Sequence, residues 1–343
     1  MTIITAQQLI EDPRYMRPHV VLLGAGASRA AFPNWDAAGW RLPVMDDIVD
    51  ILELRPLIDK AGFEIGRESN FEVIYNQLVS DPRNVCAVEK IERHIDEYFS
   101  RLSLPDRATI YDRILISLRP TDAVFTFNWD PFLFDAYQRN REAIPLPEIF
   151  FLHGNVRIGA CCDHDRWGKR NGQCPDCCQM FAKVPLLYPI HQKNYSADPY
   201  VRRSWEAART LFSEAFTVTI FGYGAPVSDV DAVELLRHAW FAESSRTLEH
   251  IQVIDTALMS LLHNRWSPFT PTLHYSVKTA FEQSRIARWP RRSCESLLYP
   301  MTQGAPCEDF PLPSTYSITE LQEYALDIAR HEKGSGLKKP SNG

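Results

Sequence analysis

The chain has 343 residues, of which 45% are hydrophobic and 23% charged, and its formal net charge is -6 with a sequence pI near 6.0. This composition fits a globular protein with one large domain and a smaller inserted module. Its scattered Lys and Arg argue against direct binding to nucleic acid or to an anionic membrane. Since we find no charged leader and no apolar run near the ~20 residues that cross a bilayer, we expect a cytoplasmic protein.

Five short apolar runs are predicted to be buried strands, because each is followed by a turn or a helix signal. They cover residues 19–23, 122–127, 148–152, 216–221 and 250–254. Helical patterns between them predict an α/β fold with a doubly wound, Rossmann-like parallel sheet. A ligand is then expected in the crevice at the carboxyl ends of the strands. We expect residues 1–300 to form this domain.

Three further segments complete the expected organisation. Helical spacing without strand patterning predicts a helical insert over about residues 44–120, and residues 157–185 are expected to form a loop-rich module without a core of its own. Residues 301–343 are expected to hold one amphipathic helix, which begins at a capping box, and a disordered tail from Gly334. Because the core is predicted to be complete by about residue 290, we expect the apolar stripe of this helix to dock on another subunit or a partner.

The first predicted strand ends in Gly24-Ala25-Gly26-Ala27-Ser28. The two glycines allow the backbone to turn tightly and to approach a pyrophosphate closely, while Ser28 can cap the helix or donate to a phosphate oxygen. A tight strand-to-helix turn without a ligand is the alternative. The context favours nucleotide binding.

Polar residues also end the second and third predicted strands. Asn128 lies just past the second strand, where its side chain can point into the crevice. Asp130 is followed by Pro131, which is typical of a helix start, so an N-cap is the alternative to a ligand. His153 ends the third strand, and Gly154 after it would give a ligand close access. A loop histidine is often inert, but an imidazole suits general-base catalysis because its pKa lies near working pH.

Two chelating pairs with the spacing of a tetrahedral structural zinc follow the third strand. They are Cys161-x-x-His164 and Cys174-x-x-Cys177, with Cys162 and Cys178 as substitute ligands. Free thiols in a loop are the alternative. A closed four-ligand site of this kind would be structural and not catalytic.

Asp255 ends the fifth predicted strand. An acid at such a position can accept the hydroxyls of an adenosine ribose, and helix capping is the equally plausible alternative. For the two acids that follow the fourth strand, Asp229 and Asp231, capping of the next helix is the expected duty.

In their order along the chain, the Gly-x-Gly turn, Thr126-x-Asn128-x-Asp130, His153-Gly154, the cysteines and the glycine loop after Phe221 resemble the sirtuin family over roughly residues 19–260. The resemblance implies NAD+ as the ligand and Zn2+ as a structural ion. It implies that Asn128 orients the nicotinamide ribose and a water, that Asp130 helps to hold the nicotinamide end, and that His153 is the general base acting on the ribose hydroxyls.

The resemblance extends to the loop after the fourth strand. In that family this loop lines the pyrophosphate and the ribose, which implies cofactor contacts for Gly222, Gly224 and Ser228. With the first turn and the acids above, the expected cofactor-binding residues are Gly24, Ala25, Gly26, Ser28, Asp130, Gly222, Gly224, Ser228 and Asp255.

Enzymes of this family cleave NAD+ with an acyl-lysine oxygen or with water as the nucleophile, and two departures favour water. Residues 31–35 read Ala-Phe-Pro-Asn-Trp where protein deacylases have Gly-Ile-Pro-Asp-Phe, and residues 186–189, which lead to Lys193, replace the Phe-Gly-Glu segment that floors the acyl-lysine groove. The pattern is similar to bacterial sirtuin-like NAD+ hydrolases of anti-phage defence. That similarity implies an NAD+-depleting effector of abortive infection, as a homo-oligomer or with a defence-system partner. A lysine deacylase and a catalytically silent NAD+- or ADP-ribose-binding module are the alternatives.

Overall fold

The structure is a computed structural model that describes residues 2–11, 17–63, 70–161, 163–190, 193–226, 229–242, 248–269 and 275–332. Three predictions therefore fall outside the described residues: Cys162 as a substitute ligand, Ser228 as a cofactor contact, and the disordered tail from Gly334. Within the described residues, we find no helix whose length and apolarity would let it cross a bilayer.

A six-stranded parallel sheet forms the centre of the molecule, in the order β3-β2-β1-β7-β8-β9. Its strands are β1 (His19–Leu23), β2 (Ala123–Thr126), β3 (Glu148–Phe151), β7 (Thr217–Phe221), β8 (His250–Ile254) and β9 (Tyr275–Lys278). Counted along the chain, this is the 3-2-1-4-5-6 order of doubly wound nucleotide-binding folds, so the predicted fold class is confirmed. The winding reverses between β1 and β7, which opens the ligand crevice of this topology at their carboxyl ends.

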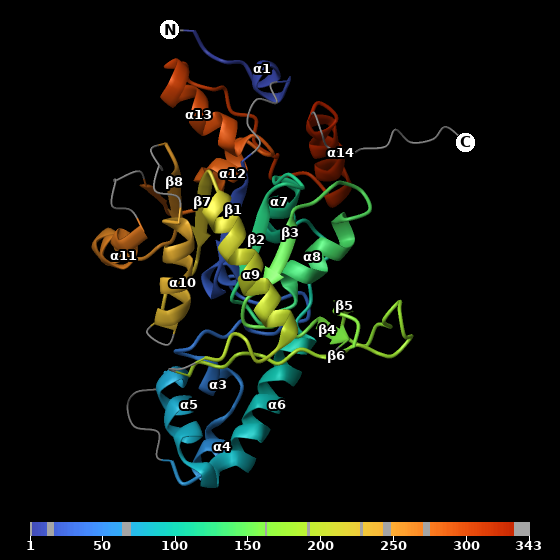
Figure 1. The fold of residues 1–343 in the computed structure, drawn as a ribbon, viewed down its shortest axis with the longest axis vertical. Helices are drawn as coiled ribbons and strands as arrows, with labels where there is room; N and C mark the ends of the chain where they lie inside the picture. The colour runs from blue at the N-terminus through green and yellow to red at the C-terminus, as the bar shows by residue number, and fades with distance from the viewer. Residues whose placement is uncertain are drawn as a thin grey trace.

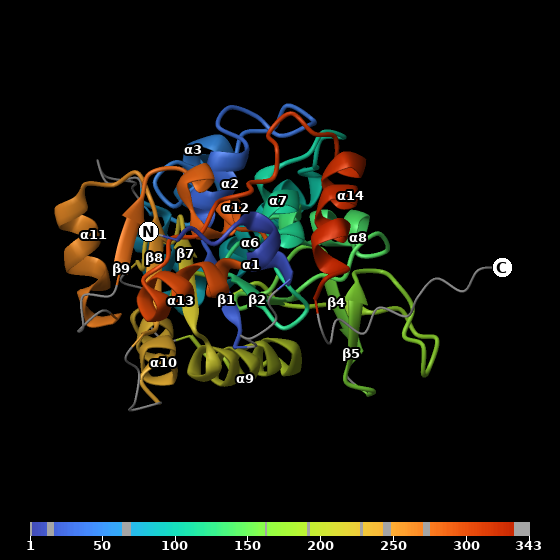
Figure 2. The same ribbon diagram turned by 90° about the horizontal axis from the view of Figure 1, so that it is seen from above.

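Helices cover both faces of the sheet, which explains why its central strands read as continuous apolar runs. All five residues of β1 and of β7 are buried. Helices α9 (Pro199–Glu214) and α10 (Val230–Trp240) lie on one face, and α2 (Ala25–Ala31) and α7 (Ile110–Ile116) lie on the other (Figure 2). Helix α8 (Phe132–Asn140) packs against α7.

The helical insert forms a lobe beyond the carboxyl end of the sheet, opposite α1 (Ala6–Glu11), α13 (Ser293–Gln303) and α14 (Ile318–Ala329) (Figure 1). It consists of α3 (Ile48–Ile51), α4 (Arg55–Lys60), α5 (Phe71–Ser80) and α6 (Val85–Arg101). The predicted stretch of 44–120 was too long, because α7 packs on the sheet-covering helices α2 and α8 instead of on this lobe.

The cysteine-rich segment is a small module with its own three-stranded antiparallel sheet, in the order β5-β4-β6. The strands are β4 (Ile158–Cys161), β5 (Arg166–Lys169) and β6 (Ala182–Lys183). Its buried Phe181 lies against two glycines: a Cβ on Gly159 would come within 2.8 Å of the Phe181 Cβ, and a Cβ on Gly168 would come within 2.9 Å of the Phe181 ring. The expected loop-rich character holds, but the three short strands were not predicted.

The C-terminal helices close the end of the sheet opposite the insert (Figure 1). They are α12 (Arg285–Arg288), α13 (Ser293–Gln303) and α14 (Ile318–Ala329), and α1 (Ala6–Glu11) lies beside α13. Helix α11 (Met259–Trp266) lies away from this end, beside β9 at the edge of the sheet (Figure 2). The predicted capping box of Ser317 and Glu320 starts α14.

The apolar stripe of α14 is not left open for another subunit, as we expected. Leu321 and Ala325 are buried against Ile116 and Leu312 of the same chain. The core is therefore not complete by residue 290.

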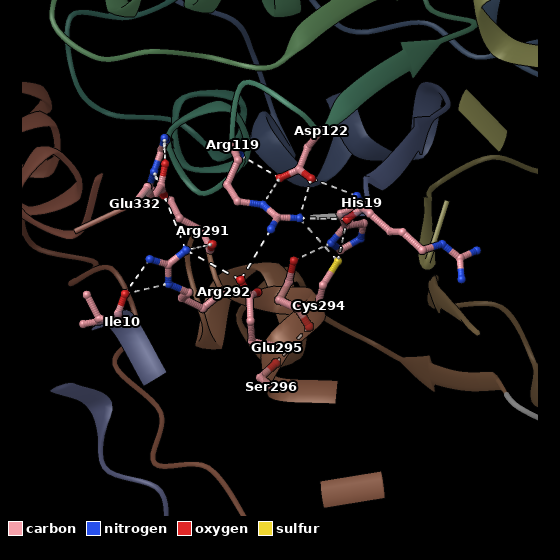
Figure 3. Close-up of polar contacts among 12 residues, drawn as sticks. Ile10, His19, Arg119, Asp122, Arg291, Arg292, Cys294, Glu295, Ser296 and Glu332 are labelled. Carbon is pink, nitrogen blue, oxygen red and sulfur yellow. Dashed lines mark hydrogen bonds and ion pairs between the residues drawn. The ribbon is translucent and has the colours of Figure 1, made fainter. Parts of the chain in front are cut away.

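A buried network of charged side chains holds this end of the molecule together (Figure 3). Arg119 pairs with Asp122 at 3.0 Å and with Glu295 of α13 at 3.4 Å. Asp122 also accepts the backbone N–H of His19 at the start of β1, at 2.8 Å. One charge cluster thus links the first strand of the sheet to the C-terminal helices. In it, each buried guanidinium lies beside a carboxylate of opposite charge, which offsets the cost of burying the ions.

Candidate active site

The largest set of predicted site residues meets in a cavity of about 370 Å³ at the carboxyl ends of β1, β2, β3 and β7. This volume lies in the range of small-molecule sites, roughly 300–1,000 Å³. Its lining includes Gly24, Ala25, Gly26, Ser28, Asn128, Asp130, His153, Gly222 and Gly224. The motifs that lie far apart in the sequence therefore share one site, at the position where the strand order reverses.

The floor of the cavity is made where the β1–α2 turn meets the loop after β7. The N–H of Gly26 donates to Gly222 O at 2.9 Å, and a Cβ on Gly222 would come within 2.3 Å of Ala27 N. Gly222 also has a positive φ of 61°. Gly26 and Gly222 are therefore needed because the two backbones lie in contact. Gly224 has open space around it, and the absence of a side chain there leaves room for a ligand.

Asn128 is held from one side, and this leaves its carbonyl oxygen to a ligand. Its Nδ2 donates to Gly24 O and to Ser28 Oγ, both at 3.0 Å, and contacts Tyr111 OH at 3.2 Å. Because Gly24 O can only accept, the amide nitrogen must face it, and this fixes the orientation of the amide. Asn128 Oδ1 is then an acceptor at the cavity wall, and no protein donor is bonded to it among the described residues.

Ser28 has a different role from the two that we predicted. It neither caps α2, whose N-cap is Gly24, nor stands open to a phosphate, because its hydroxyl is buried and donates to Asp130 Oδ2 at 2.6 Å. Tyr111 OH lies 2.6 Å from the same hydroxyl. Ser28 and Tyr111 thus form a buried hydrogen-bonded support for Asn128 and Asp130.

Asp130 lies behind Asn128 with its carboxylate buried. Burial raises the pKa of Asp130 to about 6, although the hydrogen bonds from Ser28 and from the Phe132 N–H oppose this shift. The Phe132 N–H bond of 3.3 Å agrees with the capping interpretation in part, but α8 has Pro131 as its N-cap residue. A carboxyl group that titrates near neutral pH at a cavity wall is typical of functional sites.

His153 lines the same cavity and is buried, and its ring packs edge-on against Phe127 at 4.7 Å. Burial lowers the pKa of His153 to about 4; Asp229 raises it and Lys193 lowers it. The imidazole is therefore neutral at pH 7 and can accept a proton. Gly154 does not give a ligand access as predicted: it has a positive φ of 73°, and its Cα faces the backbone of Pro185, where a Cβ would come within 2.2 Å of the oxygen.

Sequence reasoning missed the charged pair beside His153. Asp229 is the N-cap residue of α10 but makes no side-chain capping bond. Its carboxylate instead pairs with Lys193, accepts from Tyr223 OH at 3.0 Å and lies 3.7 Å from His153 Nε2. The local pattern of an acid before a helix indicated a cap, so this function had no signal in the sequence around Asp229.

The lobe of the insert provides the remaining wall. Residues 42–46 line the cavity, as do Asn70, Glu72 and Phe99. Met45 is fixed to the start of α5, because its carbonyl oxygen accepts the Phe71 N–H at 2.8 Å. The site therefore lies between the sheet and the insert.

Asp255 does not line this cavity. Its Oδ1 accepts the Ala257 N–H at 2.8 Å, so it fixes the turn after β8 and does not cap α11, whose N-cap residue is Leu258. Its role toward an adenosine ribose stays a prediction.

The four predicted metal ligands are brought together in the small module. The ligand atoms of Cys161, His164, Cys174 and Cys177 all lie within 4.8 Å of one another. Zn–S bonds are about 2.3 Å long, so two sulfur ligands of a tetrahedral zinc lie roughly 3.8 Å apart. The distance from Cys161 Sγ to Cys177 Sγ is 3.7 Å. Cys178 is exposed and lies outside this group. The donor set fits a closed structural Zn2+ site, with one histidine among three cysteines.

Comparison with known proteins adds little to this geometry. No model of a protein family matches the chain, and no curated protein matches it. Among solved structures, a Sir2 homologue in complex with NAD is 12% identical, with 88% of this chain and 96% of that one covered and a TM-score of 0.34. A structure described under the mechanism and regulation of Sir2 enzymes is also 12% identical, with 85% and 96% covered and a TM-score of 0.38. At these identities and TM-scores, the activity must be inferred from the site itself.

Proposed function

We propose that this chain is an NAD+ glycohydrolase, which converts NAD+ and water to nicotinamide, ADP-ribose and a proton. The observation that carries the proposal is the meeting of Asn128 and His153 in one cavity above the glycine floor. A bare nucleotide-binding module needs the glycines but has no use for a buried neutral imidazole that lines the same cavity as a fixed amide oxygen. Since nicotinamide is a cationic leaving group, the site has to hold the ribose, stabilise the developing positive charge and admit a nucleophile.

Each residue at the wall has a role in this reaction. Asn128 Oδ1 would accept from a ribose hydroxyl or from the attacking water and orient it. His153 would take a proton from a ribose hydroxyl or from the water. Asp130, behind Asn128, would place a carboxylate near the oxocarbenium charge at pH values above its pKa of about 6.

Contacts between the insert and residues 186–189 support water as the nucleophile. This segment stands where the family resemblance would put the floor of an acyl-lysine groove, and here helices α5 and α6 cover it. Tyr188 stacks on Tyr75 at 5.1 Å and donates to Glu92 O at 3.1 Å, and Asn76 of α5 donates to Pro189 O at 2.7 Å. An extended peptide would have to break these contacts, whereas water would not.

The biological role that we propose is depletion of NAD+ in bacterial anti-phage defence, on the strength of the motif pattern described above. Infected cells that carry the wild-type protein should then lose NAD+, while cells that carry Asn128→Ala should not. Equal NAD+ levels in both cultures after infection would argue against the role but not against the activity.

The activity is tested by following the products from NAD+ with and without an acyl-lysine peptide. We expect ADP-ribose and nicotinamide without peptide. His153→Ala should lower the rate by about 10²- to 10⁴-fold, because it removes a proton-transfer group, and Asn128→Ala should also be nearly inactive. Both variants must keep their fold for the comparison to count.

Two results would overturn the proposal in favour of its alternatives. Cleavage that needs the peptide and yields an O-acyl product would make the protein a deacylase. Binding of NAD+ without cleavage under either condition would make it a silent binding module.

A further inference from the structure

One ring nitrogen of His153 is enclosed without a hydrogen-bond partner. Nε2 is shielded from water, bonds to no described residue, and lies 3.7 Å from Asp229 Oδ1. A buried polar atom without a partner is unfavourable and is rare in folded proteins. Its retention beside a carboxylate at the cavity wall points to a role in function.

Among the described residues, the titratable groups that face this imidazole come from three segments. Asp229 and Lys193 lie on the Nε2 side, and Tyr195 stacks on the ring at a centroid distance of 6.3 Å. Tyr223 acts through Asp229, to which its hydroxyl donates. Each of these groups is buried or half-buried, so the charges act on one another with little screening by water.

A carboxylate that faces one ring nitrogen selects the tautomer of a neutral imidazole. A lone pair on Nε2 would be repelled by Asp229, whereas an Nε2–H would be attracted to it. The lone pair is then left on Nδ1. When Nδ1 takes up a proton, the imidazolium that forms lies beside a fixed negative charge.

We propose that Asp229 is the positioning residue of His153, which holds the imidazole as the Nε2–H tautomer so that Nδ1 is the nitrogen that accepts a proton. In the proposed hydrolysis, on which this step rests, a substrate O–H bond breaks, an Nδ1–H bond forms, and the imidazolium later releases that proton to water. Lys193 balances the charge of Asp229, so that the pair does not hold His153 in its protonated form. The tautomer itself does not depend on which reaction the enzyme performs.

The first experiment is ¹⁵N NMR of protein with labelled histidine, at about pH 7.5 and without substrate. The His153 resonance is identified by its absence in His153→Gln. We expect the chemical shifts of an Nε2–H, Nδ1-unprotonated ring. An Nδ1–H ring in the wild-type protein would overturn the proposal, and would do so even if the protein proved unable to cleave NAD+.

The second experiment compares kcat, KM and their pH profiles in matched variants. Asp229→Asn should lower kcat by about 10- to 100-fold, the range found when a partner that orients a metal-bound histidine is removed, with a smaller change in KM. Asp229→Glu should recover part of the loss. Asp231→Asn, the same change at an exposed position two residues along α10, serves as the control and should leave the profile unchanged.

Lys193 provides an independent readout. Because Lys193 lowers the pKa of His153, the His153 ring should take up its proton at higher pH in Lys193→Met, as followed by the same ¹⁵N resonances, and Lys193→Arg should keep that pH in place. An unchanged kcat and pH profile in folded Asp229→Asn would overturn the proposal. If Asp229→Asn fails to fold, as judged by its zinc content and thermal unfolding, the NMR measurement on the wild-type protein decides.

Discussion

At the residue scale, the glycines of the site fall into two groups with different reasons to be glycine. Gly24, Gly26 and Gly222 allow two loops to touch, since a Cβ on any of them would come within 2.7 Å of the other loop. Gly224 has no neighbour within 4 Å of such a Cβ. The first group fixes the geometry of the floor, and the second leaves space above it.

This difference gives a direct prediction for stability. Gly222→Ala should lower the free energy of unfolding by about 1–3 kcal/mol or more, because it combines a positive φ with a backbone clash. Denaturant unfolding measures the loss. Gly224→Ala is the matched control and should change the free energy of unfolding by less than about 0.5 kcal/mol. Equal effects of the two variants would mean that the loops can separate without cost.

The buried charge of Asp130 is expected to lower the free energy of unfolding at neutral pH, although the proposed reaction uses that charge. Its pKa is about 6 in the folded protein against an ordinary value of 3.8. Between these values the folded state binds more protons than the unfolded state, so the free energy of unfolding falls as pH rises through this window. Above about pH 6 the charge is buried at a cost on the order of 1–3 kcal/mol.

We therefore predict that Asp130→Asn is more stable than the wild-type protein at pH 7.5 and that this gain vanishes near pH 4. NAD+ cleavage should fall in the same variant. Urea unfolding of both proteins across the pH range measures the difference, in which the titration of other groups cancels. A gain of the same size at pH 4 and pH 7.5 would show that Asp130 is not the group that titrates.

At the element scale, the small module depends on its metal ligands more than on its apolar residues. Phe181 is buried between glycines, but most side chains of β5 and β6 are exposed or half-buried. The module is fixed to α6 by ion pairs of Asp96 with Arg170 at 3.0 Å and with Lys183 at 2.9 Å. Asp96 is buried, but Arg170 and Lys183 are partly exposed, so each pair should contribute little, about 0–1 kcal/mol, and we expect a bound ion to supply most of the local order.

We predict about one zinc per chain, and loss of that zinc with local unfolding in Cys174→Ser, because structural zinc can contribute on the order of 10 kcal/mol to folding. Metal analysis and limited proteolysis between β4 and β6 measure both effects. Cys178→Ser, at an exposed position of the same loop outside the ligand group, should keep its zinc. Zinc retained by Cys174→Ser but lost by Cys178→Ser would reassign the fourth ligand.

At the scale of the whole molecule, the chain is closed by its last helix. Leu321 and Ala325 of α14 are fully buried on Ile116 and Leu312. Just past the helix, Glu332 pairs at 2.7 Å with Arg291, whose side chain is also fully buried (Figure 3). The helix therefore completes the core of its own chain.

Glu332→Gln should destabilise the protein by about 3–5 kcal/mol, since it leaves the buried Arg291 without a carboxylate partner. Glu323→Gln, the same change at an exposed position of α14, should alter the free energy of unfolding by less than about 0.5 kcal/mol. Truncation after Pro313 should cause unfolding or aggregation. A truncated protein that stays folded and differs only in its assembly size would restore the hypothesis that α14 docks on a partner.

The sequence by itself predicted the fold class, five strands of the parallel sheet, the polar residues at their ends and the metal-ligand set. These features follow from local patterns: apolar runs, turn residues, and two chelating pairs at fixed spacing. Because parallel strands bring their carboxyl ends to one edge, Asn128 and His153 could be placed together before their contacts were known. Strand β9 was missed because its four residues, Tyr275–Lys278, are all half-buried at the edge of the sheet and form no apolar run.

Other features were decided by contacts between segments far apart in the sequence. Asp229 has the local pattern of a helix cap, and its partners Lys193 and His153 lie 36 and 76 residues away, so only the packing of three loops turns it toward the imidazole. An apolar stripe such as that of α14 is the same in sequence whether it covers its own core or a partner. Local physical chemistry fixes each element and its polar ends, whereas the pairing of buried charges and apolar faces depends on which elements meet, and the tertiary structure alone determines that.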